Sequence, residues 1–314
     1  MILICSDVNE PTTDIVCNWL TYFKKKFVRI SRDNIISFEN IHISSLKNDI
    51  KFKIDDKSYN LSDFNSYWYR RSRLNYKKLD CYTFNHEGED LTMELKIFLK
   101  QEYEKMIEFF EFKISEIAKL NTFQDNYINK LQTLNLAMNL GISIPSTTIS
   151  RHFNQKFIDN DKYITKPISD LLMEKNGKSY FSTTKRVEKK DFKEIHYSLV
   201  QNEVNKQFEI RSFYFNNQFF SSVIFSQENP KTELDFRNYD HENPNRVVPF
   251  KLPEDLEYKL AKLCHQLNLK SGSFDIAYTK NNEYVLFEVN PVGQFEQVSF
   301  PCNYKLHKRI AEYL

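Results

Sequence analysis

The sequence predicts an α/β domain followed by an α+β region. Apolar strands alternate with a helix at the start of the chain, an order typical of a parallel sheet. From Val200 onward the pattern is mostly that of antiparallel strands, with one helix at residues 253–267. We therefore divide the chain into a first α/β domain at residues 1–120, a central part at residues 121–198 and a C-terminal part at residues 199–314.

The elements of the first domain follow from its apolar patterning. Residues 11–23 carry apolar side chains at helical spacing, which predicts a helix, and residues 91–117 predict a long helix rich in Glu and Lys. Short apolar, aromatic or alternating runs predict the strands, at residues 1–5, 27–30, 52–59 and 67–69. The first two strands flank the first helix, so we expect them to be parallel.

The central part begins with a helix whose start and end are both visible in the sequence. Asn129-Lys130-Leu131 opens it, and Leu131, Leu134 and Met138 lie on one stripe. Gly141 stands where a C-terminal glycine cap belongs. Two further segments predict strands joined by polar loops, residues 157–167 and 175–185.

Composition excludes several classes of protein. The 314 residues carry 44 basic and 42 acidic side chains, and this net charge of +2 disfavours general nucleic-acid binding. None of the five glycines fits a Rossmann fingerprint or a Walker P-loop. No apolar run approaches the ~18 residues of a membrane span. The five cysteines are scattered and form no C-x-x-C, so we expect reduced thiols in a cytoplasmic protein.

A hairpin near the end of the chain gathers acidic side chains. Two apolar runs, residues 273–279 and 284–290, flank Asn281-Asn282, a turn signal because Asn tolerates positive φ. A symmetric loop centred there places Asp275 directly opposite Glu288. The opposite face, which we expect to be buried, carries Phe274, Ile276, Tyr278, Val285, Phe287 and Val289.

The two acids need a partner, because carboxylates ~4 Å apart repel by about 4 kcal/mol at an effective dielectric near 20. Protonation, a nearby Lys or Arg, or a divalent cation would each offset the repulsion. We favour the cation, because Asn290 lies on the same face and adds a neutral oxygen. Three oxygen ligands on a hairpin suit Mg²⁺, and a solvated acidic face balanced by lysines is the alternative.

Basic side chains elsewhere could bind an anion. Lys166 ends the strand-like run of residues 163–166, from which it could contact phosphate. Glu209 and Arg211 alternate onto one strand face after a connector at residues 200–205, and an ordinary ion pair is the simpler interpretation of that spacing. Asp235-x-Arg237 likewise places an acid beside a cation, as a surface salt bridge would.

The order of these pieces resembles a known superfamily. Lys130, Lys166, the segment 201–211, Asp235-x-Arg237, Asp275 and Glu288-Val289-Asn290-Pro291-x-Gly293-Gln294 occur as in ATP-grasp enzymes. The chain is most similar to the maturases that make graspetides, ribosomal peptides with ester or amide cross-links, and within them to the grasp-with-spasm group. Ile2 to Asp7 and Trp68-Tyr69-Arg70-Arg71 add to the likeness, which spans nearly the whole chain.

The resemblance implies a fold and a role for each matching residue. The fold would be a pre-ATP-grasp α/β domain and two α+β subdomains that clasp ATP. The implied roles are phosphate contacts for Lys130 and Lys166, the adenine end for Gln201, Glu203 and Val204, ribose for Glu209, phosphate or activated carboxylate for Arg211, the core peptide for Asp235 and Arg237, and Mg²⁺ for Asp275, Glu288 and Asn290. Asp235 would orient or deprotonate the attacking hydroxyl.

The implied activity is ATP-dependent macrocyclisation of a precursor peptide that has a leader and a core. Asp or Glu side chains would become acyl phosphates, which Thr, Ser or Lys side chains attack. Residues 91–117 and 67–73 are candidate leader-docking elements, and a homodimer is expected from the family. Two alternatives remain open: an ATP-grasp ligase that adds an amino acid to a carboxylate, and a non-catalytic nucleotide- or peptide-binding module.

Overall fold

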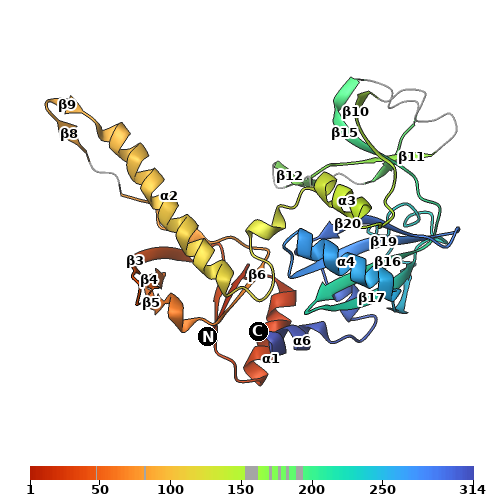
Figure 1. The fold of residues 1–314 in the computed structure, drawn as a ribbon, viewed down its shortest axis with the longest axis horizontal. Coiled ribbons are helices and arrows are strands. Elements are labelled where there is room, and N and C mark those ends of the chain that lie inside the picture. Colours follow the sequence, from red (N-terminus) through yellow and green to blue (C-terminus); the bar gives the residue numbers. More distant parts are fainter. Residues whose placement is uncertain are drawn as a thin grey trace. The chain divides into compact units, whose positions relative to one another are not determined.

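The computed structural model describes residues 1–46, 48–80, 83–152, 162–169, 172–175, 178–181, 184–188 and 194–314. The chain forms two compact units (Figure 1). They are Met1–Gln124 with His307–Leu314, and Asp125–Leu306. Parts of the predicted strands 157–167 and 175–185 lie outside the described residues, as do Cys81 and Gly177. The predicted division at residues 198 and 199 stays a prediction.

The first unit opens with the predicted strand–helix–strand order. Its elements are β1 (Ile2–Ser6), α1 (Pro11–Tyr22), β2 (Phe27–Ile30) and β6 (Ser66–Arg70). The three strands form a parallel sheet in the order β2-β1-β6, which confirms the expected parallel pairing. Glu10 begins α1, because its carboxylate accepts a hydrogen bond from the Thr13 amide at 2.6 Å.

A second sheet in this unit corrects one predicted strand. Its order is β5-β4-β3-β7, formed by β3 (Ile35–Ile43), β4 (Asn48–Ile54), β5 (Lys57–Asn60) and β7 (Asn75–Tyr76), with a short 3₁₀ turn, η1 (Leu61–Asp63), after β5. Residues 52–59 are not one strand, because a turn separates β4 from β5. Asp55 adopts φ 51° in that turn, a conformation that Asp tolerates better than most residues.

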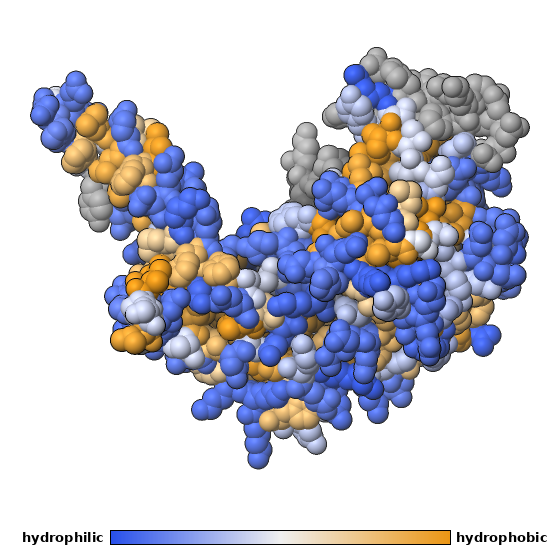
Figure 2. Space-filling model, viewed as in Figure 1, coloured by the Kyte–Doolittle hydropathy of each residue, from blue (hydrophilic) through white to orange (hydrophobic). Residues whose placement is uncertain are grey.

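A long helix and a small hairpin complete the first unit. The hairpin strands are β8 (Asn85–His86) and β9 (Glu89–Asp90). They precede α2 (Thr92–Glu116), which confirms the helix predicted at residues 91–117. Figure 1 draws the hairpin at the far end of α2. Helix α2 has few buried residues, and Figure 2 shows hydrophobic patches along it. Its exposed apolar side chains are Met93, Ile97, Phe98, Met106 and Phe112.

The terminal helix, α6 (Leu306–Tyr313), is held at its carboxyl end by a lysine of the first unit. Lys25 Nζ donates to the Ala311 and Glu312 carbonyl oxygens at 3.0 and 2.7 Å. A cation there satisfies carbonyls that have no helical partner. In the part of the chain that the structure describes, no helix is both long and apolar enough to cross a membrane.

The second unit contains two larger antiparallel sheets and a β-ribbon. The first sheet has the order β10-β15-β11-β14, from β10 (Thr147–His152), β11 (Tyr163–Lys166), β14 (Lys185–Arg186) and β15 (Glu194–Asn202). The second has the order β18-β17-β16-β19-β20, from β16 (Lys206–Phe215), β17 (Gln218–Phe225), β18 (Arg246–Phe250), β19 (Ser271–Thr279) and β20 (Tyr284–Asn290). The ribbon pairs β12 (Leu172–Lys175) with β13 (Lys178–Phe181).

Helices of the second unit pack on the five-stranded sheet. They are α3 (Lys130–Asn139) and α4 (Glu254–Gln266), while η2 (Gln124–Asn126) and α5 (Glu296–Ser299) are short. Figure 1 shows α3 and α4 over the same sheet. The core between them contains Ala137 of α3, Leu260 of α4, and Ile210, Phe274 and Leu286 of the sheet.

The ends of α3 follow the sequence signals, but its buried face differs. Asn129 Oδ1 accepts from the Leu131 amide at 2.9 Å, and Gly141 has φ 69°, as an N-cap and a C-terminal glycine require. The predicted stripe is wrong at Met138, which is 55% exposed. Ala137 occupies the buried position instead and belongs to the core between α3, α4 and the sheet.

Candidate nucleotide and peptide site

The β19–β20 hairpin brings the predicted acids together. Asp275 pairs with Glu288 in register, and Ser273 pairs with Asn290. Asn282 adopts φ 64° in the turn, as its type predicts. All three predicted metal ligands therefore lie on one face at the end of the hairpin.

The hairpin departs from the predicted alternation at Phe287. Beyond the acids the register shifts by one residue, and Ile276 pairs with Leu286. A β-bulge of this kind turns one side chain to the other face. Phe287 was predicted in the core, but its ring lines the cavity described below, and Leu286 takes its place in the core.

Basic side chains surround the two acids. Arg211 on β16 contacts Asp275 through a hydrogen-bonded ion pair. Arg237 Nη1 lies 2.9 Å from Glu288 Oε1, and Lys130 Nζ lies 3.4 Å from Glu288 Oε2. These cations offset the repulsion between the carboxylates, so proximity of the acids does not by itself require a metal ion.

Burial and these cations give the two acids different pKa values. Burial raises the pKa of Asp275 to about 6, although Arg211 works against the rise. Burial would also raise the pKa of Glu288, but the positive charges of Arg237, Lys130 and Lys166 outweigh burial and lower the pKa of that carboxyl. Glu288 therefore carries its negative charge throughout the neutral range.

The three side chains fit a hard cation chemically. Asn290 Nδ2 donates to Glu288 Oε1 at 3.2 Å and to Asp275 Oδ2 at 3.3 Å, so all three converge within hydrogen-bond range. A half-turn of the amide presents its oxygen in place of its nitrogen. Two carboxylates and an amide oxygen are suitable ligands for Mg²⁺. Among the described residues, no group of three or more His, Cys, Asp and Glu side chains could hold a metal ion, so the candidate site depends on the oxygen of Asn290.

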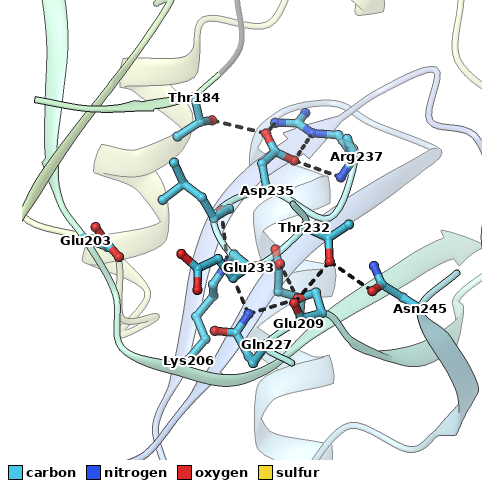
Figure 3. A network of polar contacts seen from close by, with 12 residues as sticks. Thr184, Glu203, Lys206, Glu209, Gln227, Thr232, Glu233, Asp235, Arg237 and Asn245 are labelled. Carbon is cyan, nitrogen blue, oxygen red and sulfur yellow. Dashed lines mark hydrogen bonds and ion pairs between the residues drawn. The ribbon is translucent and has the colours of Figure 1, made fainter. Parts of the chain in front are cut away.

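The predicted Asp-x-Arg is an internal clamp (Figure 3). Arg237 Nε and Nη2 each donate to an Asp235 oxygen at 2.8 Å, and Thr184 Oγ1 donates to Asp235 Oδ2 at 3.2 Å. Burial raises the pKa of Asp235, but the Arg237 contacts outweigh it and leave that pKa below its usual value. Such a carboxylate is a poor proton acceptor near neutral pH, so its geometry favours orienting Arg237 over deprotonating a hydroxyl.

A cavity of about 510 Å³ lies beside these groups. Among the predicted site residues, those that line it are Lys166, Glu203, Val204, Glu209, Asp235, Arg237, Asp275 and Glu288. Lys166 Nζ lies 5.9 Å from the centre of the Phe287 ring, and burial lowers its pKa. Lys130 and Arg211 reach the same acids from outside the lining.

The connector at the adenine end is shorter than predicted. Residues 200–202 belong to β15, so only Glu203, Val204 and Asn205 link it to β16. Gln201 is buried in the strand and donates to Thr147 Oγ1 at 2.9 Å, away from the cavity lining. Gln201 pairs with Thr147 of β10 and Ile164 of β11, so β15 continues past it and the connector begins only after Asn202.

Glu209 and Glu203 are already engaged by basic side chains that the sequence did not single out. Lys206 Nζ lies 3.0 Å from Glu209 Oε1, and Ser226 Oγ donates to the same oxygen at 2.9 Å. Burial raises the pKa of Glu209 in spite of Lys206. Arg186 Nε and Nη2 donate to Glu203 at 2.8 and 2.9 Å. Strict alternation would place Lys206 and Glu209 on opposite faces, and the irregularity between Lys206 and Phe208 brings them together, so no sequence spacing indicated either Lys206 or Arg186.

The chain has an ATP-grasp fold, as comparison with solved structures shows. Macrocyclase MdnC bound with precursor peptide MdnA from Microcystis aeruginosa MRC superposes with a TM-score of 0.73 at 22% identity, covering 100% of this chain and 98% of that one. A RiPP-associated ATP-grasp ligase of Chryseobacterium gregarium, in complex with ADP and a leader and core peptide, gives 0.74 at 18% identity, covering 99% and 94%.

A third neighbour is the ATP-grasp ligase PsnB, complexed with a phosphomimetic variant of a minimal precursor, Mg and ADP. Its TM-score is 0.66 at 12% identity, and the alignment covers 99% of this chain and 96% of that one. No protein-family model and no curated protein matches the sequence. The predicted α/β and ATP-grasp architecture is therefore confirmed at the level of fold.

Proposed function

We propose that this protein is an ATP-dependent macrocyclase of ribosomal precursor peptides. The observation that carries the proposal is the cavity between the two sheets of an ATP-grasp fold, where Asp275 and Glu288 stand opposite each other among Lys130, Lys166, Arg211 and Arg237. When every charged side chain of the lining is counted together with Lys130 and Arg211, eight basic side chains face six acidic ones. That excess of positive charge suits a triphosphate.

Different residues along the cavity would bind different parts of the nucleotide. Lys166 and Lys130 lie at the acid pair, where they would neutralise phosphate oxygens as point charges. The backbone of Glu203 and Val204 would contact the adenine, since the Glu203 carboxylate is already bound by Arg186. Asp275, Glu288 and Asn290 would hold Mg²⁺, which when bound neutralises phosphate charge.

The proposed reaction has two steps. A carboxylate oxygen of the peptide attacks the γ-phosphorus, the bond to the β–γ bridging oxygen breaks, and ADP and an acyl phosphate form. A peptide hydroxyl or amine then attacks the acyl carbon, loses its proton, and expels inorganic phosphate. Arg211 and Arg237 would hold the carboxylate in line, because such chemistry depends mainly on positioning and charge neutralisation.

The peptide partner is proposed to bind through a leader and a core, the two peptide parts found in complex with the Chryseobacterium gregarium ligase. We propose α2 as the leader-docking element, because its exposed apolar side chains include Ile97, Phe98 and Phe112 (Figure 2). The second predicted docking surface, residues 67–73, is largely inaccessible, because Tyr67, Trp68, Tyr69, Arg70 and Ser72 are buried. An apolar helix face that its own unit leaves uncovered suits an amphipathic peptide segment.

Two further parts of the proposal come from the sequence: the cytoplasmic location from the scattered cysteines, and the homodimer from the family resemblance. The protein would act in the cytoplasm, and it would form a homodimer. Light scattering coupled to gel filtration tests the second point, and a monomer at working concentration would contradict it. Neither part affects the proposed chemistry.

Intact mass spectrometry tests the proposed function. The chain is co-expressed with a short candidate precursor rich in Thr and in Asp or Glu, and the peptide mass is measured. A macrocyclase removes one water per cross-link, whereas an amino-acid ligase increases the mass. Absence of Mg²⁺-dependent ADP binding by the purified chain would contradict both activities.

A further inference from the structure

The loop that carries Asp235 and Arg237 contacts β14 of the opposite sheet, and the residue just before that strand, through the guanidinium of Arg186 and the hydroxyl of Thr184. Arg186 on β14 donates through Nε and Nη2 to both oxygens of Glu203, in the connector at the adenine end. The same Nη2 lies 2.9 Å from Glu233 Oε1, in the loop between β17 and β18. One side chain therefore joins the base-binding connector to the loop of the Asp-x-Arg.

The loop is held at three consecutive residues next to the cavity. Arg186 binds the Glu233 side chain, Lys206 Nζ donates to the Leu234 carbonyl at 3.1 Å, and Thr184 Oγ1 donates to Asp235 Oδ2 at 3.2 Å. Thr184 and Arg186 are alternate residues of one extended segment, so both present side chains to the same side.

Stability does not explain this arrangement. The Arg186 side chain is 42% exposed, and an exposed ion pair contributes only ~0.2–1 kcal/mol. Its geometry, in contrast, is specific: a guanidinium fork on one carboxylate and a shared nitrogen on a second fix two separate segments at once. Glu203 is the better covered of the two acids, with 17% of its side chain exposed.

We propose that Arg186 is a positioning residue that transmits nucleotide occupancy at the connector to the loop bearing Asp235 and Arg237. This inference rests on the proposed function, because it assumes that a nucleotide occupies the cavity. Binding at the connector fixes Glu203, Glu203 fixes Arg186, and Arg186 fixes Glu233 two residues before Asp235. The carboxylate-holding side chains are thus ordered when ATP is present.

Hydrogen exchange with Mg²⁺ and ADP as the probe tests the inference. In the unmodified chain, saturating ADP should slow exchange of the amides at residues 233–238 by at least ~5-fold, the lower end of usual couplings between sites. Arg186→Ala should abolish that slowing even at saturating ADP. Glu233→Ala should abolish it too, while ADP still binds with an affinity changed by no more than the coupling factor, because the contact of Arg186 with Glu203 remains.

Lys251→Ala is the matched control, since it removes an exposed ion pair of the same unit, with Glu257 at 2.6 Å, and should leave the slowing intact. A loop that ADP slows equally in both test variants overturns the inference, as does ADP binding that leaves the unmodified loop unchanged. If Arg186→Ala does not fold, the exchange measurement on Glu233→Ala alone tests the role of Arg186. An unmodified chain that binds no ADP overturns the proposed function itself.

Discussion

Arg237 grips Asp235 with two nitrogens at 2.8 Å and reaches Glu288 with its third at 2.9 Å. The Asp-x-Arg and the acid pair are therefore one hydrogen-bonded unit, although more than 50 residues separate Arg237 from Glu288 in the sequence. Removing any member leaves a buried or half-buried charge without its partner.

Glu288→Gln tests the metal assignment. The variant keeps the side-chain shape but loses the charge that Lys130 and Arg237 now balance. We expect no water loss from the peptide and at least ~10- to 100-fold weaker Mg²⁺-dependent ADP binding, since even supporting contacts around a metal contribute that much. Calorimetry with and without Mg²⁺ measures it. The control is Glu283→Gln in the exposed turn of the same hairpin, and equal binding by both variants would reject the assignment.

Asp235→Asn separates orientation from proton transfer. Because Arg237 keeps the pKa of Asp235 below its usual 3.8, the carboxylate stays ionised over the neutral range. If Asp235 only orients Arg237, Asp235→Asn lowers the rate at every neutral pH and leaves the shape of the pH–rate profile unchanged. Loss of the acidic limb in the variant would instead identify a base. Glu242→Gln, exposed in the same loop, should behave like the unmodified chain.

The same pKa shift makes a stability prediction. A carboxyl whose pKa is lowered on folding adds stability above its unfolded pKa, and that stability disappears as the pH falls through the folded value. The unmodified chain should therefore lose this contribution below pH 3.8, whereas Asp235→Asn should lack it throughout. Thermal melts of both proteins between pH 7 and pH 3 measure the difference. A difference in melting temperature between the two proteins that stays constant from pH 7 down to pH 3 would contradict the prediction.

Local signals accounted for the parts of the site that the sequence predicted. The Asn281-Asn282 turn predicts the hairpin, but the pairs next to the turn would by themselves set Asp275 opposite Phe287. The bulge after Asp275 restores the predicted pairing with Glu288. The N-cap at Asn129 and the glycine at Gly141 are equally local, and they placed Lys130 at the start of α3. A lysine is disfavoured in a first helical turn, and its contact with Glu288 explains its presence there.

Non-local pairing accounts for what the sequence did not reveal. Arg186, Thr184 and Lys206 become part of the site only because two sheets face one cavity, and no spacing along the chain records that. The boundary of β15 at Asn202 depends on ladder partners in β10 and β11. The bulge after Asp275 depends likewise on packing, since α3 and α4 take up Leu286 rather than Phe287.

Gly293→Ala tests the turn after Asn290. A Cβ on Gly293 would lie 2.1 Å from Ser273 Oγ and 2.4 Å from Ser273 Cβ, which no side chain tolerates. We expect destabilisation by ~1–3 kcal/mol, as for other overpacked sites, and weaker ADP binding because Asn290 shifts. Denaturant melts measure the first effect. Ser273→Gly in the same chain should restore part of the stability.

The control for that prediction is Gly272→Ala. Its added Cβ would meet no atom closer than 3.6 Å, an ordinary contact, so the variant should fold with near-normal stability. Equal destabilisation by Gly272→Ala and Gly293→Ala would indicate that position 293 requires glycine for its backbone freedom rather than for the close approach of Ser273.

Phe287→Ala tests whether the bulge turns this ring into the cavity. Lys166 and Lys206 each lie with Nζ 5.9 Å from its centre, and such contacts contribute ~0.5–2 kcal/mol. Removing the ring should weaken ADP binding by ~2- to 30-fold with little loss of stability. Phe274→Ala, which empties a fully buried position, should instead cost ~3–5 kcal/mol of unfolding free energy. If Phe287→Ala destabilises the fold as strongly and leaves ADP affinity unchanged, the ring belongs to the core and the bulge is misplaced.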